Sequence, residues 1–386
     1  MPPFRLPPPQ NASVDLLLVA GEHSGDQQAA ALVRQLKPLA PGLAIAALGG
    51  PALAGAGVQV LHDMTATSVV GLVEVLKNIR HFRAVFNATL DWITTHRPRA
   101  VCLVDYPGFN LRLAAELRKR GLSRKGGGKI AVLYYISPQI WAWKARRRFT
   151  MARDLDALAT IFPFEPKCYA DTTLPVEFVG HPFLDPAHRP IVRHAPDAPV
   201  LLLPGSRKQA VARIFPALLA GYQAAVKTNP RDAVVLHPSD EIKSILQARD
   251  LPETVRLRQA AAGQAAGEPV AASAVLTSSG TMQLHCALAG IPGAIAYRAN
   301  PLTYQLGRRL VKIPWLGITN ILLGEPMYPE YLQGAATPEA LARELDDCLR
   351  NPARLEKTRG QAARLRRILS HPTGSTPAAW LLRRMG

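Results

Sequence analysis

Residues 14–36 read VDLLLVAGEHSGDQQAAALVRQL, and this stretch decides the fold. Its first seven residues form a mostly apolar run that ends at Gly21, and the residues after the polar turn repeat apolar positions at helical spacing. The pattern predicts a strand, a tight turn and a helix. We expect Ser24 to be the N-cap and Asp26 to lie in the first turn, where a carboxylate interacts favourably with the helix dipole.

The same layout recurs along the rest of the chain, where short apolar runs alternate with helical stretches. Apolar runs that predict strands lie at residues 44–48, 100–104, 130–136, 157–162, 200–203, 233–237, 274–277 and 293–297. Three helices are predicted at the end of the chain, at residues 338–350, 352–369 and 377–384. Such alternation favours parallel sheets covered by helices on both faces. The expected fold is α/β, with two doubly wound Rossmann-like domains facing a central cleft.

A Pro-rich segment, residues 182–199, separates the two series of strands and is the best candidate for a linker. We expect residues 1–13, which begin MPPFRLPPPQ, to form a disordered leader. The N-terminal domain is then predicted at residues 14–190 and the C-terminal domain at residues 191–386. The sequence leaves open whether the last helix packs on the first domain.

Composition excludes several classes of protein. The chain has 386 residues, of which 48% are hydrophobic and 19% charged, so it is neither disordered nor a coiled coil as a whole. No apolar run reaches the length of about 18–20 residues that spans a bilayer. The four cysteines show no CxxC, zinc or disulfide pattern. These features indicate a cytoplasmic protein.

The formal net charge of +18 is shared about evenly by the two halves, with local clusters such as KARRR at residues 144–148. This cluster follows the tryptophans Trp141 and Trp143, and a second basic cluster lies at residues 308–312. Indole rings beside cations suit an anionic membrane surface, where each cation contributes about 1 kcal/mol. Nucleic acid also attracts basic surfaces, but the chain has no helix-turn-helix, finger, RNP or KH signature. A solvated charged surface is the third interpretation.

Two loops of the second half have the composition of anion-binding turns. Residues 204–207 (PGSR) and 278–281 (SSGT) each follow a predicted strand and precede a predicted helix, whose N-terminal N–H groups attract anions. Arg207 adds a guanidinium suited to phosphate. One such loop is common for packing reasons alone, whereas two in one domain favour a nucleotide site.

Three further residues are candidates for chemistry in the first half. Asp105 ends a predicted strand, where a carboxylate serves either as a general base or as a turn-forming residue before Tyr106. His23 and His181 both lie in loops close to glycine and are able to polarise a hydroxyl or bind phosphate, although loop packing is the more common role for each. Patterns typical of zinc proteases, serine hydrolases, P-loop NTPases and EF-hands are absent from the sequence.

Together these motifs resemble the lipid-A-disaccharide synthase family of bacteria. The matching segments occur in the family's order: VAGEHSGD at residues 19–26, GLVEVL at 71–76, DYPGFN at 105–110, YISPQIWAW at 135–143, FPFE at 162–165, FVGHP at 178–182, LPGSR at 203–207, SGT at 279–281, YR at 297–298, NIL at 320–322 and PEYLQ at 329–333. They span most of the chain, and as an ordered set they are highly specific.

The resemblance implies an inverting glycosyltransferase of the B type. Such enzymes join UDP-2,3-diacylglucosamine to 2,3-diacylglucosamine 1-phosphate and release UDP. The acceptor then binds the N-terminal domain and the UDP-sugar binds the C-terminal domain, without a metal ion. Both substrates carry acyl chains, which implies peripheral attachment to the inner face of the inner membrane and no nucleic-acid partner. The oligomeric state does not follow from the sequence.

The resemblance also implies roles for individual residues. Asp105 is the expected base. The acceptor side is expected to comprise Gly21, Glu22, Ser24, Gly25, Asp26, Asn110 and His181. The UDP side is expected to comprise Gly205, Ser206, Arg207, Ser279, Gly280, Thr281, His285, Arg298, Asn320 and Gln333. The expected membrane contacts are Trp141, Trp143, Arg146, Arg147 and Arg148.

The chain departs from the family pattern mainly on the donor side. Ala210 and His285 stand where the family has acidic residues, Ser273 replaces a usual Asp, and Gly108 replaces the Asp of the family's PDFN motif. A neutral His accepts a ribose hydrogen bond more weakly than a carboxylate does. A degenerate relative that binds lipid or nucleotide without catalysis, or uses another donor, is therefore the alternative function.

Overall fold

The computed structural model describes residues 4–65, 72–260, 268–301, 304–305, 307 and 313–386, and only the backbone of residues 72–79. The chain divides into two compact units. Unit 1 contains Met1–Pro182 and His371–Gly386, and unit 2 contains Phe183–Ser370. Gly71 of the GLVEVL motif and the basic cluster at residues 308–312 lie outside the described residues.

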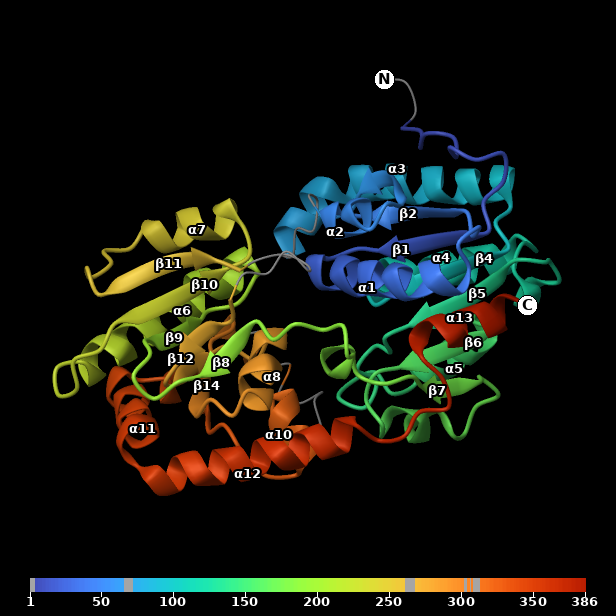
Figure 1. The fold of residues 1–386 in the computed structure, drawn as a ribbon. Coiled ribbons are helices and arrows are strands. Elements are labelled where there is room, and N and C mark those ends of the chain that lie inside the picture. The colour runs from blue at the N-terminus through green and yellow to red at the C-terminus, as the bar shows by residue number, and fades with distance from the viewer. Residues whose placement is uncertain (1–3, 66–71, 261–267, 302–303, 306, 308–312) are drawn as a thin grey trace. The chain divides into compact units, whose positions relative to one another are not determined.

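Unit 1 is built on a parallel sheet of seven strands in the order β3-β2-β1-β4-β5-β6-β7 (Figure 1). The chain order reverses between β1 and β4, as in doubly wound folds. The strands are β1 (Leu16–Ala20), β2 (Ile45–Gly49), β3 (Gln59–Asp63), β4 (Ala100–Val104), β5 (Ala131–Tyr135), β6 (Ala157–Thr160) and β7 (Val176–Phe178).

Helices cover both faces of this sheet, which is why its central strands are continuous apolar runs. Leu17 and Val19 of β1 point into the core beneath one set of helices: α3 (Leu72–His96), α4 (Pro107–Lys119) and α5 (Arg147–Asp154). Leu16 and Leu18 point into the opposite core, beneath α1 (His23–Leu39), α2 (Pro51–Gly55) and α13 (Pro377–Met385). The short 3-10 helices of unit 1 are η1 (Arg124–Gly126) and η2 (Glu165–Tyr169).

Unit 2 repeats this plan with six parallel strands in the order β11-β10-β9-β13-β14-β15. Its strands are β9 (Val200–Leu203), β10 (Ala233–His237), β11 (Val255–Gln259), β13 (Val275–Thr277), β14 (Gly293–Tyr297) and β15 (Glu330–Leu332). A separate two-stranded sheet joins β8 (Val192–His194) to β12 (Val270–Ala272). The predicted pair of doubly wound Rossmann-like domains is therefore confirmed as a fold class.

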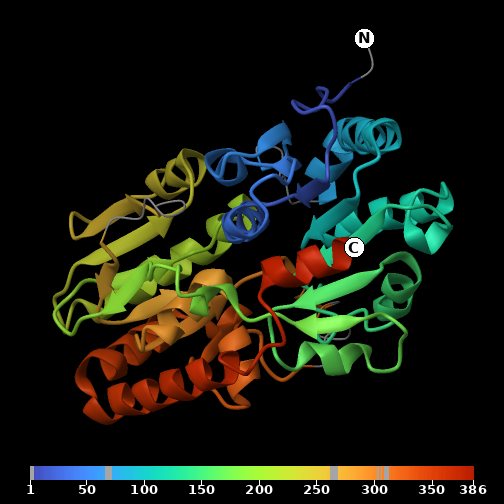
Figure 2. The same ribbon diagram turned by 45° about the vertical axis from the view of Figure 1, so that its right-hand side comes forward.

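The helices of unit 2 also flank its sheet (Figures 1 and 2). One apolar core joins the sheet to α6 (Lys208–Ala225), α7 (Asp240–Gln247) and α11 (Pro338–Arg350). The remaining helices, in contact with one another, are α8 (Thr281–Leu288), α10 (Ile318–Leu323) and α12 (Pro352–Leu369). The 3-10 helices η3 (Pro182–Leu184), which begins at the boundary of the units, and η5 (Gln333–Ala335) complete the described elements.

The sequence did not predict six of the described strands, and all six are edge strands of their sheets. They are β3 and β7 in unit 1, β11 and β15 in unit 2, and the pair β8 and β12 that forms the two-stranded sheet. An edge strand is covered on fewer sides, so it carries polar residues, as in QVLHD (β3) and VRLRQ (β11), and it lacks a continuous apolar run. The signal used to find the central strands is therefore missing from these segments.

The expected disorder of residues 1–13 is wrong for the described part of the leader. The indole Nε1 of Trp92 donates to the carbonyl of Pro7 at 2.9 Å, and the amide of Gln59 donates to the carbonyl of Pro8 at 2.8 Å. The backbone N–H of Gln10 returns a bond to Gln59 Oε1 at 2.9 Å. These partners lie far along the chain, so local composition did not reveal them.

The predicted N-cap is also wrong: helix α1 begins at His23, and its N-cap is Glu22 rather than Ser24.

The last helix packs on the first domain, which is the alternative that the sequence left open. Helix α13 lies against α1, β5 and β6, so residues 371–386, which the range 191–386 had included in the C-terminal domain, belong to unit 1. The reason is burial, since Trp380 and Leu381 are fully buried in the core of unit 1. The described boundary between the units follows Pro182.

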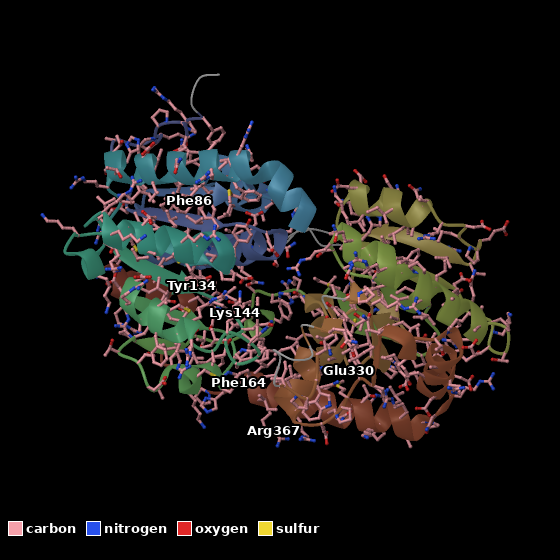
Figure 3. The ribbon with its side chains drawn as sticks, turned by 180° about the vertical axis from the view of Figure 1, so that it is seen from behind. Phe86, Tyr134, Lys144, Phe164, Glu330 and Arg367 are labelled. Atoms are coloured by element: carbon pink, nitrogen blue, oxygen red, sulfur yellow. The ribbon has the colours of Figure 1, made fainter. Side chains whose placement is uncertain are left out.

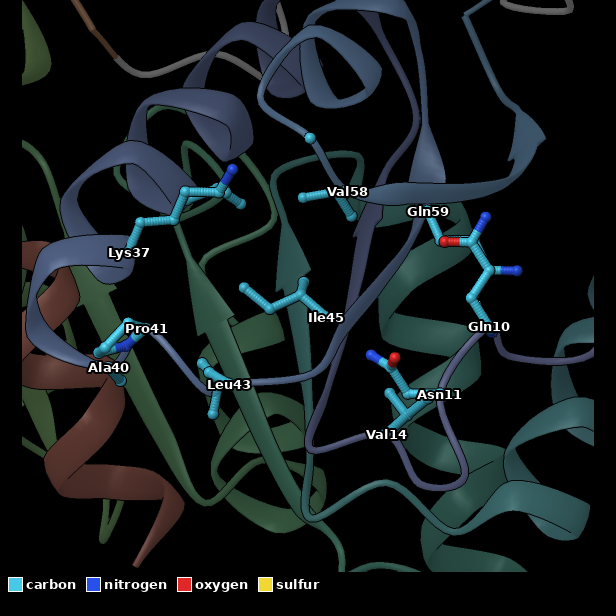
Figure 4. A pocket seen from close by; sticks show the side chains of 12 residues that line it. Gln10, Asn11, Val14, Lys37, Ala40, Pro41, Leu43, Ile45, Val58 and Gln59 are labelled. Atoms are coloured by element: carbon cyan, nitrogen blue, oxygen red, sulfur yellow. The ribbon is translucent and has the colours of Figure 1, made fainter.

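A small cavity of about 210 Å³ lies near the amino ends of β1 and β2 (Figure 4). Gln10 and Gln59 line one part of it, and Lys37 and Ile45 line another. Ligands of doubly wound folds bind at the carboxyl ends of the strands. This cavity lies at the other end of the strands, so we assign it no part in the chemistry.

Candidate functional site

The carboxyl ends of the central strands hold most of the candidate residues of both units. Doubly wound sheets bind ligands where the strand order reverses. In unit 1 this point lies between β1, followed by Gly21, and β4, followed by Asp105. In unit 2 it lies between β9, followed by the loop with Gly205, and β13, followed by Ser278.

Asp105 has an unusual backbone that its neighbours hold in place. Its φ of 47° and the φ of 50° at Tyr106 are both left-handed, which costs about 1–2 kcal/mol for each non-glycine residue. The carbonyl of Asp105 accepts hydrogen bonds from Asn110 Nδ2 at 2.7 Å and from the Tyr134 hydroxyl at 2.5 Å. The backbone N–H of Asp105 donates to the carbonyl of Tyr135 at 3.0 Å. Backbone strain that neighbouring groups hold in place is typical of functional positions.

Gly21 provides space for Tyr106. A Cβ atom at residue 21 would lie 2.0 Å from Cδ1 of the Tyr106 ring, so a side chain there requires the ring to move. A Cβ at Gly25 would make only an ordinary contact, 3.6 Å from the carbonyl oxygen of Val104. Burial, followed by the charge of Glu22, raises the pKa of Tyr106. Gly21, Glu22, Tyr106 and Asp105 therefore form one cluster.

Two of the predicted acceptor residues have their polar groups engaged by the backbone. The Asp26 carboxylate is 1% exposed and accepts bonds from the backbone N–H groups of Gly50 (2.8 Å), Ala52 (2.8 Å) and Leu53 (3.2 Å). It therefore caps the first turn of α2. Asn110 Nδ2 also donates to the carbonyls of Val19 and Val104, at 3.3 Å each. The side chains of Asp26 and Asn110 therefore hold the backbone at this edge of the sheet. Ser24 is exposed, as a ligand contact requires.

Glu165 is a buried acid that sequence reasoning had assigned no role. Its carboxylate is 1% exposed and accepts the N–H groups of Phe162 at 3.0 Å and Ile161 at 3.3 Å. The indole Nε1 of Trp141 donates to its other oxygen at 3.3 Å. Burial raises the pKa of Glu165 to about 7, although these donors oppose the shift, and the charge of Asp105 raises it further. An acid among apolar and aromatic residues shortly after a buried strand, in the FPFE motif, is the signal that could have revealed it.

His181 follows β7 and is 6% exposed, and its ring lies 5.4 Å from that of Phe162. The loops after β6 and β7 therefore meet at the edge that also carries Glu165. Figure 3 labels Tyr134 on β5 and Phe164 in the loop after β6, within this part of unit 1.

The structure separates the five predicted membrane residues into two groups. Trp141 is half-buried, bonded to Glu165, and packed edge-on against Phe164 at 5.5 Å. Arg148 makes a two-point ion pair with Asp171, at 2.7 and 2.5 Å. Trp143 is 43% exposed, with Lys144 Nζ 4.3 Å from its ring, and Phe149 is 48% exposed.

Arg146 is exposed and Arg147 is half-buried, with its guanidinium 5.8 Å from the Trp143 ring. We call Trp143, Lys144, Arg146, Arg147 and Phe149 the aromatic–basic segment. Its lysine is labelled in Figure 3. Trp141 and Arg148 lie beside this segment but have partners within the protein.

In unit 2 the two predicted anion-binding loops are adjacent. The backbone N–H of Ser278 donates to the carbonyl of Leu203 at 2.8 Å. Gly205 has a left-handed φ of 110°, and a Cβ there would lie 3.2 Å from Ser278 Oγ. The two loops lead into α6 and α8. Ser279 is half-buried, and the exposed residues of the loops are Ser206, Arg207, Gly280 and Thr281. Two helices therefore begin from neighbouring strand ends, where their free backbone N–H groups attract anions.

Arg298 and Gln333 follow the neighbouring strands β14 and β15, so they share this carboxyl edge. Arg298 donates to the carbonyl of Ala336 at 2.7 Å. The Gln333 amide pairs with the backbone of Ala299, accepting its N–H at 2.8 Å and donating to its carbonyl at 3.2 Å. Both side chains therefore stabilise the loops that follow β14 and β15.

Asn320 is fully buried, and both ends of its amide have protein partners. Its oxygen accepts the N–H groups of Met327 at 3.0 Å and Tyr328 at 3.1 Å, and its nitrogen donates to the carboxylate of Glu330 at 2.9 Å. Glu330, labelled in Figure 3, also accepts the N–H groups of Leu316 and Gly317 at 2.8 and 2.9 Å. Both ends of the Asn320 amide are therefore engaged within the protein, at the turn where α10 begins, and its contact with UDP stays a prediction.

His285 lies in a stack of rings. Its ring centroid is 3.7 Å from that of Phe183 and 5.3 Å from that of His188, and the residue is 8% exposed. Of the other departures from the family pattern, Ala210 is half-buried in α6 and Gly108 is exposed. Ser273 is buried, and its hydroxyl oxygen has no hydrogen-bond partner among the described residues.

None of the helices in the described part of the chain has the length and apolar character of a membrane span. No group of three or more His, Cys, Asp or Glu side chains there is arranged to hold a metal ion.

Comparisons with known proteins agree with the resemblance of the motifs. A family model described as Lipid-A-disaccharide synthetase matches residues 16–376. The lipid-A-disaccharide synthase of Geobacter sulfurreducens is 36% identical over 374 residues, which cover 93% of this chain and 94% of the relative. Lipid-A-disaccharide synthase 1 of Legionella pneumophila (strain Lens) is 36% identical over 371 residues, which cover 92% and 93%.

Solved structures of glycosyltransferases share the fold. The glycotransferase of kitacinnamycin matches with a TM-score of 0.58 at 15% identity, covering 97% of this chain and 99% of that one. The calicheamicin glycosyltransferase CalG4 matches with a TM-score of 0.54 at 15% identity, covering 97% and 98%. At this identity the likeness concerns the fold alone.

Proposed function

The chain belongs to the lipid-A-disaccharide synthase family, and from this premise we propose that it joins UDP-2,3-diacylglucosamine to 2,3-diacylglucosamine 1-phosphate. It is a glycosyltransferase of lipid A biosynthesis. The comparisons offer no support for the alternative of a non-catalytic relative. The proposed acceptor site is the carboxyl edge of unit 1, and the proposed donor site is the carboxyl edge of unit 2.

Asp105 acts as the general base in this proposal. Its carboxylate takes the proton of the acceptor hydroxyl while that oxygen forms a bond to the anomeric carbon of the donor. The bond between the anomeric carbon and the UDP oxygen breaks, and the configuration inverts. The observation that carries this role is the pinned, left-handed backbone of Asp105, held by Asn110 and Tyr134 at the end of β4. Gly21, Glu22, Ser24, Gly25 and His181 lie at the same edge of unit 1.

The leaving UDP gains negative charge as its bond breaks, and unit 2 has groups suited to that charge. The N-termini of α6 and α8 begin side by side, and Arg207 adds a positive charge beside them. Dipoles and cations aimed at developing charge are the main electrostatic device of such reactions. We propose that these groups stabilise UDP without a metal ion, so treatment with a chelator leaves the rate unchanged.

We also propose that the enzyme works at the cytoplasmic surface of the inner membrane, where its acylated substrates lie. The aromatic–basic segment supports this, because it offers two exposed rings among three cations. Exposed indole and phenyl rings insert at the headgroup level, and cations are attracted to anionic lipid.

The decisive experiment detects product by mass spectrometry from the two diacylated glucosamine substrates. We expect the wild type to form disaccharide 1-phosphate and UDP, and Asp105→Asn to lose about 100-fold or more of the rate. Calorimetric titration with UDP is the control, since Asp105 lies in unit 1 and the variant should bind UDP normally. Unchanged turnover in Asp105→Asn would remove Asp105 from the mechanism.

A further inference from the structure

Ser278 belongs to the second of the two anion-binding loops of unit 2, but its side chain has no part in the function proposed above. The residue directly follows β13 and is 8% exposed. Its backbone N–H donates to the carbonyl of Leu203 at 2.8 Å, and its carbonyl accepts the hydroxyl of Thr277 at 2.9 Å. The backbone of Ser278 is therefore held by its neighbours, which leaves the side chain to be explained.

The hydroxyl of Ser278 lies close to both loops. A Cβ atom at residue 205 would lie 3.2 Å from Ser278 Oγ, and a Cβ atom at residue 280 would lie 3.7 Å from the same oxygen. The backbones of Gly205 and Gly280 therefore both pass near this hydroxyl. Because neither residue has a side chain, neither covers it.

This hydroxyl forms no hydrogen bond with any residue that the structure describes. A serine hydroxyl has one proton to donate and two lone pairs that accept. Burying such a group without a partner is costly, and most buried hydroxyls are bonded to protein or to ordered water. A hydroxyl that is more than nine-tenths buried and lacks a partner, next to two ligand-type loops, indicates a polar ligand at this place.

The helix starts beside the hydroxyl favour an anion over a neutral ligand. Neither N-cap, Arg207 for α6 or Gly280 for α8, accepts a first-turn N–H group with its side chain. The first turns of both helices also contain no acidic residue. The partial positive charge of these N–H groups is therefore not compensated locally, and an anion is the ligand that it attracts.

We propose that Ser278 is a binding residue for the diphosphate of the UDP donor, and that its hydroxyl donates a hydrogen bond to a phosphate oxygen held by the starts of α6 and α8. This inference rests on the function proposed above. A hydrogen bond to an ionised acceptor is stronger than one to a neutral acceptor. The charge of UDP grows as its bond to the sugar breaks, so the same hydrogen bond strengthens during the reaction.

The first experiment measures by calorimetry how UDP, UMP and uridine bind to the wild type and to Ser278→Ala. We expect Ser278→Ala to bind UDP about tenfold more weakly, as is typical for the loss of one hydrogen bond to a charged group. Uridine has no phosphate, so its affinity should be the same for both proteins. A loss for UMP equal to that for UDP assigns the contact to the phosphate next to uridine, and a loss for UDP alone assigns it to the terminal phosphate.

Ser273→Ala is the matched control. It makes the same chemical change before β13, whereas Ser278 follows this strand. Ser273 is 3% exposed, and its hydroxyl oxygen also lacks a partner among the described residues. We expect its UDP affinity to equal that of the wild type. Both variants should keep a melting temperature close to that of the wild type, because neither loses a described side-chain hydrogen bond.

The second experiment measures steady-state kinetics with the two diacylated substrates. Ser278→Ala should lower kcat/KM for the UDP-sugar by about tenfold or more, since the lost bond also acts on the leaving UDP. The KM of the acceptor should not change, because the proposed acceptor site belongs to unit 1.

The outcomes separate the inference from the proposed function. UDP affinity that is unchanged in Ser278→Ala, or an equal loss of affinity for uridine, overturns the inference. A wild type that binds UDP through Ser278 but forms no disaccharide contradicts the proposed glycosyl transfer alone, whereas a wild type that does not bind UDP contradicts both. If Ser278→Ala does not fold, Gly280→Ala provides the test: its methyl group fits against the hydroxyl and should weaken the binding of UDP but not that of uridine.

Discussion

The side-chain nitrogen of Asn110 lies 2.7 Å from the carbonyl oxygen of Asp105 and 3.3 Å from the carbonyl oxygens of Val19 and Val104. One amide thus joins the ends of β1 and β4 at the point where the strand order reverses. The same bond holds the left-handed backbone that carries the proposed base. The backbone conformation of Asp105 is therefore a property of Asn110 as much as of Asp105 itself.

Asn110→Ala should lower both stability and rate. It removes the fully buried amide that donates to three backbone carbonyls, of which only that of Asp105 keeps another side-chain donor, Tyr134, and this costs about 1–3 kcal/mol. Thermal unfolding and kcat measure the two effects. Asn110→Asp keeps the size but replaces the donor by an acceptor, so it should be the more damaging change. Wild-type stability in Asn110→Asp would contradict the assigned bonds.

Gly21 and Gly25 form a matched pair for the turn after β1. Gly21→Ala should displace the Tyr106 ring and with it Asp105, reducing kcat by about tenfold or more, because small displacements of reacting groups have large effects on rate. Gly25→Ala makes the same chemical change where the new methyl group fits, and should keep most of the activity. Equal losses in both variants would argue against the role of the Tyr106 ring.

Glu165 predicts a pH dependence of stability. The folded protein raises its pKa from 4.5 to about 7, so the native state binds more protons than the unfolded chain between these values. Stability should therefore fall as the pH rises from 4.5 to 7, by about 3 kcal/mol for the whole shift. The unfolding midpoint of the wild type should drop between pH 5 and pH 8 relative to that of Glu165→Gln. If the unfolding midpoints of the wild type and Glu165→Gln changed with pH in parallel, the raised pKa of the buried Glu165 carboxyl would be contradicted.

Substitutions of Arg146 and Arg148 test the proposed membrane contact, because each removes one positive charge. Arg146 is exposed, whereas Arg148 is paired with Asp171. Arg146→Gln should weaken co-sedimentation with anionic liposomes about fivefold, which corresponds to about 1 kcal/mol per cation. Arg148→Gln should have a smaller effect, since its charge is already compensated by Asp171. Trp143→Ala should weaken the binding to anionic liposomes, whereas Trp141→Phe should not. Weaker liposome binding in Trp141→Phe than in Trp143→Ala would contradict the membrane role of the aromatic–basic segment.

The donor side predicts different effects for Arg207 and Asn320. Arg207→Ala should weaken UDP binding about tenfold, as expected for one charge-assisted contact to phosphate. Asn320→Ala should instead lower the melting temperature, because it breaks the bonds to Met327, Tyr328 and Glu330. Its UDP affinity, measured by calorimetry on folded protein, should change less than twofold. If Asn320→Ala lost much of its affinity for UDP and kept the wild-type melting temperature, Asn320 would instead be a residue that contacts UDP.

Sequence alone determined the layout of the two units. Runs such as residues 100–104, 233–237 and 293–297 coincide with β4, β10 and β14, and the helices predicted at 338–350 and 352–369 coincide with α11 and α12. The cause is local, because a strand buried on both faces must be apolar throughout and Gly, Pro or a capping residue must end it. The edge strands β3 and β15 escaped prediction because partial exposure removes that constraint.

Only the tertiary structure decided what the candidate residues do. Asp26 and Asn320 carry polar groups typical of a site, yet their partners at Gly50 and Tyr328 are backbone groups that the fold brings to them. Glu165 is an ordinary acid in sequence, and its raised pKa arises from burial and from Asp105, which lies 60 residues earlier in the chain. Hydrogen-bond partners and burial depend on segments distant in sequence, so the pattern of residues predicts a site, while packing decides which of its side chains already have partners within the protein.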